Sequence, residues 1–244
     1  MSSHPGGDDV AQQLAHLTQA VQRLSAQQEI QNLMGTYTVN HVPRNMHDHV
    51  ALFAMEMDDV SVEVGDRGVY VGPEAVRTLF DRQFRMEPKG NLLIHYLCTP
   101  MIEVAGDGRS ARGVWRSPGI EAVVLAGADR PTPLWSFGAY AVDFIHLQGR
   151  WKIWHLHWMR TIKCRFDAGW VDDLSMAFSG PLPDSPSLRP TTYHNPYTPD
   201  AVQHSIPPCP RPHPHYEGPQ WKTVEQGLVP APGDGAVATG PDNP

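Results

Sequence analysis

Residues 150–158, "RWKIWHLHW", decide the fold, because three tryptophans and two histidines lie within these nine positions. Successive side chains of a strand point to opposite faces, so alternation predicts two sets of residues. One face is expected to carry Trp151, Ile153, His155, His157 and Met159, and the other Lys152, Trp154, Leu156, Trp158 and Arg160. Neither set is simply polar. The strand is therefore expected to be covered on both faces.

Three longer strands are predicted before this one, at about 92–104, 109–125 and 134–147. The turns "AGDG" and "LQGR" join neighbouring strands, as in an antiparallel meander. The stretch "DDVSVEVGDRGVYVG" alternates like a hairpin around Gly65 and Gly68. These segments predict one mostly antiparallel sheet.

Helices are predicted ahead of the strands. Leu14, Leu17, Val21 and Leu24 have helical spacing, and Ile30, Leu33, Met34 and Tyr37 continue it. The spacing predicts one long helix, or two abutting ones, that ends before Pro43. "MHDHVALFAME" and "GPEAVRTLFDRQF" predict a second and a third helix. Helices followed by a run of strands indicate an α+β fold.

Proline divides the chain into parts. Most prolines follow residue 180, and proline removes a backbone donor, so this part cannot form the interior of a sheet. We expect a disordered start at 1–8, one domain at 9–178, an ordered proline-rich arm at 179–222 and a disordered tail at 223–244.

Charge and composition exclude several functions. The net charge is −7 and no lysine or arginine run occurs, which argues against a nucleic-acid or anionic-membrane partner. No signal peptide and no apolar run of the ~20 residues that a membrane helix needs are visible. Cys98, Cys164 and Cys209 are scattered and form no C-x-x-C pair. We therefore expect reduced thiols in a cytoplasmic protein.

The ordered motifs resemble the SnoaL-like branch of the nuclear-transport-factor-2-like (NTF2-like) superfamily over roughly residues 25–160. They are "EIQNLMGTYTVNHV", "HVALFAMEMDDVSVEV", "GVYVGPEAVRTLF", "IHYLCTPMIEVAGDGRSARGVW" and "GAYAVDFIHLQGRWKIWHLHW". The resemblance implies a conical barrel, in which a curved sheet wraps a long helix around an apolar pocket. The proline-rich arm is longer than in the simplest members. Fold alone does not give function, because the superfamily contains enzymes and binding proteins.

The resemblance also implies site residues. Its dehydratase and lyase members, such as scytalone dehydratase, bile-acid dehydratase and diarylpropane formaldehyde lyase, work without a cofactor. Their helix tyrosine and strand histidine match Tyr37 and His95. The aspartate that often follows five residues after the tyrosine is replaced by Val42. His41, one helical turn after Tyr37, is the nearest polar candidate, so Tyr37, His41 and His95 are the predicted catalytic residues.

Four further residues are candidates for substrate binding. If "AGDG" makes a tight hairpin, residue 97 lies opposite Arg116, which then shares the face of His95; a bulge would reverse this. Tyr140 matches the tyrosine of the family's "G-x-Y" strand, and Trp115 could stack on an aromatic ligand. His157 lies in an H-x-H pair that lacks a third ligand at a recognisable spacing, so we expect no metal.

The leading hypothesis is a cofactor-independent lyase acting on a hydrophobic, hydroxylated, aromatic or polycyclic small molecule. Elimination of water and elimination of formaldehyde both remain open. The alternatives are a polyketide cyclase or ketone isomerase, and a small-molecule-binding module without catalysis. A homodimer or homotrimer is expected, because the outer face of the sheet carries Trp and Leu side chains that a monomer would expose.

Overall fold

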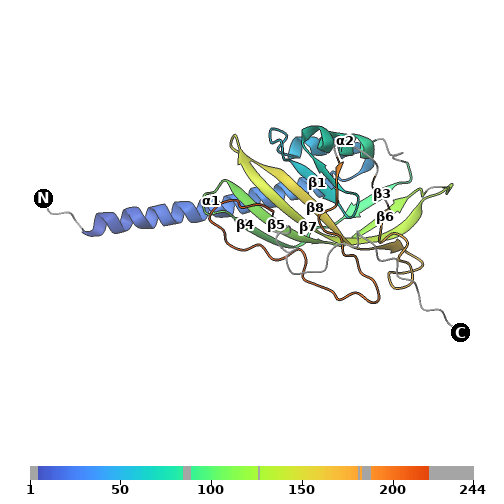
Figure 1. Ribbon diagram of the computed structural model, residues 1–244. Helices are drawn as coiled ribbons and strands as arrows, with labels where there is room; N and C mark the ends of the chain where they lie inside the picture. The colour runs from blue at the N-terminus through green and yellow to red at the C-terminus, as the bar shows by residue number, and fades with distance from the viewer. Residues whose placement is uncertain (1–4, 85–88, 126, 181, 183–187, 220–244) are drawn as a thin grey trace.

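A computed structural model describes residues 5–84, 89–125, 127–180, 182 and 188–219 of the 244-residue chain. It has two α-helices and a 3₁₀ helix: α1 (Pro5–Val39), η1 (Pro43–Leu52) and α2 (Pro73–Phe84). The strands are β1 (Ser61–Val64), β2 (Val69–Val71), β3 (Leu92–His95), β4 (Cys98–Val104), β5 (Ser110–Ser117), β6 (Gly119–Val123), β7 (Thr132–Leu147), β8 (Arg150–Arg165) and β9 (Leu188–Arg189). The α+β class is as predicted (Figure 1).

The sheet is built around β7 and β8, which pair antiparallel over almost their whole length. Its strand order is β3-β6-β7-β8-β1-β2-β9, and β5 also pairs with β7 and carries β4. Pro118 separates β5 from β6, so both strands pair with β7, at different ends of it. The predicted strands at 92–104 and 109–125 are thus each divided in two. Most pairs are antiparallel, and β1 joins β8 in parallel.

The strand at 150–165 does not alternate throughout. The register of β7 with β8 shifts between the pairs Asp143↔His155 and Phe144↔Ile153, so Trp154 is an extra residue in a β-bulge. Trp151, Ile153, Leu156 and Trp158 all belong to the main core, on the inner face of the sheet. The predicted common face of Ile153, His155 and His157 is wrong, because the bulge reverses the side on which the later residues lie.

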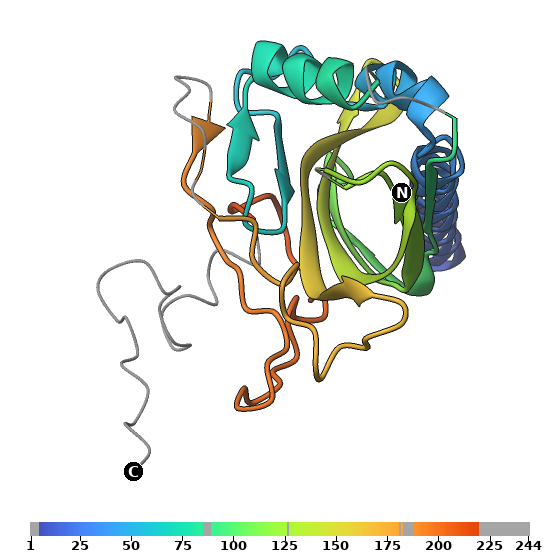
Figure 2. The ribbon, with the colours of Figure 1, turned by 90° about the vertical axis from the view of Figure 1, so that its right-hand side faces the viewer.

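The helices cover the inner face of the curved sheet, and the core lies between them (Figure 2). Ile30, Met34 and Tyr37 of α1 are buried there, as are Val76 and Phe80 of α2. The predicted third helix is confirmed as α2, whereas the predicted second helix is the 3₁₀ helix η1. This packing brings the C-terminal end of α1 over the middle of the sheet.

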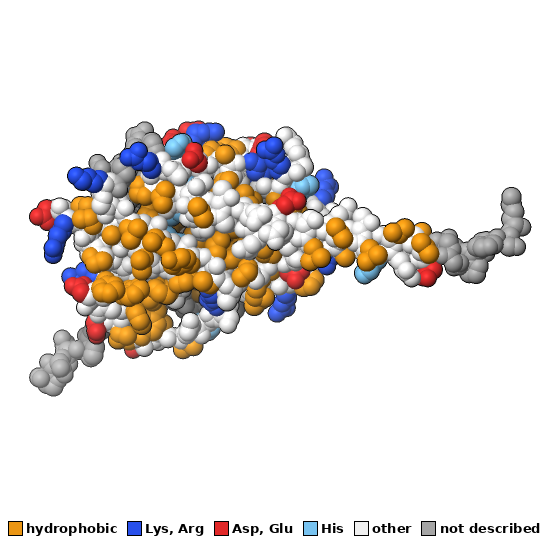
Figure 3. Space-filling model, turned by 180° about the vertical axis from the view of Figure 1, so that it is seen from behind, with side chains coloured by type: hydrophobic (Ala, Val, Ile, Leu, Met, Phe, Trp, Pro, Cys, Tyr) orange, Lys and Arg blue, Asp and Glu red, His pale blue; other side chains and the backbone are white. Residues whose placement is uncertain are grey.

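Helix α1 is longer than the body it packs on. It begins at Pro5, a residue with a φ suited to a first helical turn. Its N-terminal part projects well beyond the sheet (Figures 1 and 3). Leu14, Leu17, Val21 and Leu24, which continue the predicted helical spacing, are exposed. None of the described helices is long and apolar enough to cross a membrane.

Residues 188–219 run along the outer face of the sheet (Figure 2). The Tyr216 ring lies 4.4 Å from that of Trp154, and Thr192 donates two hydrogen bonds to the carboxylate of Glu63 in β1. The predicted tail at 223–244 and residues 1–4 lie outside the described residues. The arm therefore covers the apolar outer face, for which the sequence allows either the proline-rich arm or a second subunit.

Candidate active site

Three of the predicted residues meet on the inner face of the sheet. Tyr37 is in the last turns of α1, His41 follows that helix, and His95 ends β3. The ring centroids of Tyr37 and His41 are 5.6 Å apart, and those of His41 and His95 are 5.5 Å apart. Tyr140, from β7, lies 6.0 Å from Tyr37. Residues far apart in the sequence therefore form one cluster of hydroxyl and imidazole groups.

Glu121 adds a carboxylate that sequence reasoning missed. It faces Leu93 across the β3–β6 pair, two residues from His95 and hence on the same side of the sheet. One carboxylate oxygen lies 3.4 Å from His95 Nε2, and the other accepts a 2.6 Å hydrogen bond from Lys163 Nζ. All three side chains are largely buried. A single acid in the apolar stretch "GIEAVV" is the signal that could have identified it.

The buried ion pair keeps Glu121 ionised. Burial alone raises the pKa of its carboxyl, but hydrogen bonds from His95 and Lys163, with the positive charge of Lys163, outweigh burial and hold the pKa well below its usual value. The ionised carboxylate of Glu121 can accept a hydrogen bond from His95 Nε2 only when that nitrogen carries a proton. This contact favours the tautomer that leaves Nδ1 as a lone-pair acceptor.

Several polar atoms of this cluster are buried without a protein partner. Among the described residues, His41 Nδ1, His95 Nδ1 and Trp158 Nε1 have no hydrogen bond. The Trp158 ring is 5.6 Å from that of His95. Buried polar groups are nearly always paired, so several orphans in one place indicate groups that a bound molecule would satisfy.

Burial sets the protonation of the neighbouring groups. It lowers the pKa of His41 well below 6.5, and repulsion from His95 and His49 adds to the effect. Burial raises the pKa of the Tyr37 and Tyr140 hydroxyls, which therefore keep their protons. The cluster thus offers neutral imidazole as a proton acceptor and phenolic hydroxyls as proton donors.

His49 supports this cluster from behind and was also missed. It is fully buried, its ring stacks on Phe80, and it packs edge-on against Tyr37 with 4.6 Å between centroids. Its nitrogens lie 2.9 Å from the Tyr37 carbonyl oxygen and 3.1 Å from that of Met46. These contacts fix the end of α1, and so position Tyr37.

The predicted placement of Arg116 beside His95 is wrong. A bulge between Cys98 and Met101 places Cys98, rather than residue 97, opposite Arg116. Arg116 is exposed on the outer face, where it lines a cavity of about 160 Å³ together with Met159, Tyr193 and Ile206. Trp115, its neighbour, points inward instead and donates a 3.1 Å hydrogen bond to Gln31 Oε1 of α1. Trp115 therefore packs the core and holds the helix.

His157 is also on the outer face, away from the predicted catalytic residues. It is fully buried, and its Nδ1 lies 3.5 Å from the Glu63 carboxylate, which Thr192 of the arm also binds. Nearby, His155 Nδ1 lies 3.1 Å from Asp143, and the Tyr216 hydroxyl donates to that carboxylate over 2.8 Å. These polar groups attach the arm to the sheet.

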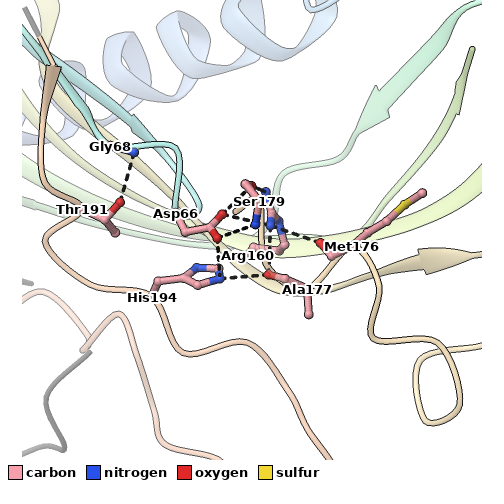
Figure 4. Close-up of polar contacts among 8 residues, drawn as sticks. All are labelled: Asp66, Gly68, Arg160, Met176, Ala177, Ser179, Thr191 and His194. Carbon is pink, nitrogen blue, oxygen red and sulfur yellow. Dashed lines mark hydrogen bonds and ion pairs between the residues drawn. The ribbon is translucent and has the colours of Figure 1, made fainter. Parts of the chain in front are cut away.

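A second network fixes the start of the arm (Figure 4). Asp66, Arg160, Ser179 and His194 converge, with Arg160 donating to Asp66 at 3.2 Å and to the Ala177 carbonyl at 2.9 Å. Burial raises the pKa of Asp66, but hydrogen bonds from Ser179 and the charges of His194 and Arg160 lower it overall. The buried charges beside the outer cavity are thus bound to one another.

Among the residues that the structure describes, no group of three or more His, Cys, Asp or Glu side chains has the arrangement of a metal site. The orphaned atoms of the inner cluster are two imidazole nitrogens and an indole N–H, and an indole N–H cannot bind a cation. These atoms can donate or accept hydrogen bonds to the oxygen substituents of an organic molecule.

Residues 22–157 match the family model described as SnoaL-like domain. A solved hexachlorocyclohexane dehydrochlorinase (LinA Type2) is similar at 17% identity and a TM-score of 0.50, over 69% of this chain and 99% of that one. A protein assigned as a scytalone dehydratase from Novosphingobium aromaticivorans DSM 12444 is similar at 16% identity and a TM-score of 0.49, over 62% and 94%. At such identities the solved structures show the fold alone. No curated protein matches the chain.

Proposed function

We propose that this chain, which belongs to the SnoaL-like domain family, is a lyase that eliminates water or formaldehyde from a hydrophobic, hydroxylated, aromatic small molecule. One observation carries the proposal. His95 faces an ionised Glu121 through Nε2, while its Nδ1, His41 Nδ1 and Trp158 Nε1 are buried without a partner among the described residues. A base held by a carboxylate next to unused hydrogen-bonding groups is an arrangement suited to proton transfer.

In dehydration, His95 Nδ1 would take a proton from the carbon next to the one that bears the hydroxyl. The electron pair of that C–H bond becomes the double bond as the carbon–oxygen bond breaks. Tyr37, whose raised pKa keeps its hydroxyl protonated, supplies the proton that turns the leaving hydroxyl into water. Glu121 stabilises the imidazolium that forms on His95. These side chains supply both proton transfers that the dehydration needs.

In formaldehyde loss, a phenol first gives its proton to one of the two histidines and expels a benzylic hydroxyl, which takes a proton from Tyr37 and leaves as water, so that a quinone methide forms. His95 or His41 then removes the proton of a terminal hydroxymethyl group. Its carbon–carbon bond breaks, formaldehyde leaves, and the electron pair restores the aromatic ring. Arg116, the predicted substrate-binding arginine, lies on the other face and cannot hold the phenolate. Trp158 Nε1, a buried donor whose ring lies 5.6 Å from that of His95, would hold an oxygen atom instead.

The inner face supports an aromatic, apolar substrate. Tyr37, Phe53, Tyr140 and Trp158 belong to its core cluster, and aromatic rings there would stack on a ring of the substrate. A hexachlorocyclohexane dehydrochlorinase, named for an elimination, has a similar fold. The outer cavity at Arg116 is a less favoured site, because the neighbouring Arg160 and His194 already bind Asp66 and backbone carbonyls.

The test is product mass spectrometry of the purified protein with phenolic diols and hydroxylated polyketides, in the presence of a formaldehyde trap. Loss of one water identifies a dehydratase, and trapped formaldehyde identifies a deformylating lyase. A new product of unchanged mass contradicts the lyase proposal and favours the isomerase or cyclase alternative. A bound compound recovered unchanged favours a binding module.

A further inference from the structure

The N-terminal part of α1 carries an apolar stripe that nothing in the described protein covers. Val10, Leu14, Leu17, Val21 and Leu24 are 55%, 59%, 60%, 61% and 65% exposed. They are spaced alternately four and three residues apart, which is the seven-residue repeat of a coiled coil. They occupy every a and d position between 10 and 24, and the stripe lies on the part of α1 that projects from the body (Figure 3).

This stripe faces away from the protein's own body. From Ala26 onward α1 buries a different face, with Ile30 and Met34 in the core. Val21 and Ile30 are nine residues apart, which at about 100° per residue is two and a half turns. Their side chains therefore point in opposite directions. The stripe cannot pack on the sheet of its own chain, and two copies can meet along it with their bodies on the outer sides.

The charges are distributed as in a self-associating helix. Positions e and g, which flank the stripe, hold Ala11, Gln13, Thr18, Ala20, Ser25 and Gln27, all uncharged. The charged Asp9 and Arg23 both lie at position c, on the outside. Two identical helices would thus meet without like-charge repulsion, and Leu at all d positions but one suits a two-stranded seam.

We infer that residues 10–24 of α1 form a two-stranded coiled coil with the same segment of a second copy. This inference goes beyond the proposed function and is independent of it. Residues 26–37, packed on the sheet, provide the nucleated helix from which the projecting part extends, so the cost of starting a helix is already met. The outer sheet face, covered by the arm, is not needed for association. The seam spans only about two heptads, so we expect a micromolar dimer.

The test is the mass of the full chain in sedimentation equilibrium, measured from low to high micromolar concentration. Wild-type protein should approach twice the mass of one chain. Leu17→Glu, which places a charge in both halves of the seam, should raise the dimer Kd by at least about 100-fold. The matched control is Gln19→Glu, which adds the same charge on the opposite side of the same helix and should leave Kd within about threefold.

Near-ultraviolet circular dichroism establishes that both variants keep the folded domain. A wild-type chain that stays monomeric, or a Leu17→Glu chain that still dimerises, would overturn the inference. A monomeric chain that binds neutral lipid vesicles through α1 would also overturn it. The helix lacks the basic polar face that surface-bound amphipathic helices have, since Arg23 and His16 are the only basic residues between positions 9 and 25.

Discussion

Glu121 is a buried carboxylate between two nitrogen bases, and its charge stabilises both. Lys163 donates to it at 2.6 Å, and His95 Nε2 lies 3.4 Å away. Glu121→Gln keeps the shape but leaves Lys163 buried without an anion. We expect it to lower the free energy of unfolding by about 3 kcal/mol at pH 7. Turnover by the folded fraction should fall at least about tenfold, because His95 loses the group that fixes its tautomer.

The pH dependence of this variant distinguishes charge from shape. A lowered carboxyl pKa stabilises the folded state fully above the unfolded value of 4.5, and the stabilisation is lost as the pH falls below it. Urea unfolding between pH 6 and about pH 3 should show this loss in wild-type protein and less of it in Glu121→Gln. Glu29→Gln, on the exposed side of α1, is the control. Equal pH profiles for wild-type protein and Glu121→Gln would contradict the assignment.

Burial of His41 makes the free energy of unfolding depend on pH in a second range. Its lowered pKa means that the unfolded chain binds a proton below pH 6.5 that the folded protein excludes. Stability should therefore rise with pH up to about 6.5 and level off above it. His41→Gln removes this proton, so the free energy of unfolding of the variant should rise less steeply with pH. The difference in slope should be at most about 1.4 kcal/mol per pH unit. His16→Gln, on exposed helix, is the control in the same urea titrations.

At the residue scale the sequence indicated half of the candidate site. Tyr37, His41 and His95 could be proposed from their residue types and the family resemblance, and the structure brings them together. Glu121 could not be paired with His95 from the sequence, because the pairing depends on the register of β3 with β6. His49 approaches Tyr37 only through the path of η1, whose position on the end of α1 could not be predicted from the sequence.

At the scale of elements, two bulges explain the errors. Alternation predicts faces correctly only while the register is continuous, and one inserted residue exchanges the two faces. The shift between Cys98 and Met101 separates Arg116 from His95, and the extra residue Trp154 separates Ile153 from His157. A bulge has no consistent composition, so neither shift could be located from the sequence.

Gly119, the first residue of β6, packs so closely against β3 that a side chain at this position would clash. A Cβ on it would lie 2.6 Å from the Ile94 carbonyl oxygen and 2.7 Å from His95 Nδ1. Gly119→Ala should therefore displace β3 and His95, lowering the free energy of unfolding by about 1–3 kcal/mol and reducing turnover. Gly35→Ala is the matched control, because a Cβ there meets nothing within 4 Å. This helical site should gain up to about 1 kcal/mol. Thermal unfolding of both variants measures the contrast, and equal effects would contradict it.

At the scale of the whole molecule, the arm covers the outer face of the sheet. The Tyr216 hydroxyl donates to Asp143 over 2.8 Å, beside His155. Tyr216→Phe should cost about 1–3 kcal/mol of stability, because a buried carboxylate loses a donor. Turnover should be unchanged, since the inner cluster lies across the sheet. Tyr197→Phe, whose hydroxyl donates to no described residue, is the control for chemical denaturation, and an equal loss in both variants would contradict the role of Tyr216.

The overall architecture was accessible from the sequence because α1, α2, β7 and β8 are long enough for their helix or strand patterns to be recognised. What covers the outer face was not accessible, because the apolar residues near Trp154 suit either a second subunit or the proline-rich arm. The structure places the arm there. The spacing of the apolar residues at 10–24 predicted a helix, but helical spacing does not say what an apolar helix face contacts, and these residues are exposed.

The central claim is that chemistry takes place at His95 on the inner face of the sheet. The most direct test compares the turnover of His95→Gln and His157→Gln on a converted phenolic or polyketide substrate, each rate normalised to the folded fraction. The account predicts a loss of at least about 100-fold for His95→Gln, the contribution of a general base, and less than about threefold for His157→Gln. Near-normal turnover by His95→Gln, or a large loss confined to His157→Gln, would place the reaction elsewhere and contradict the account.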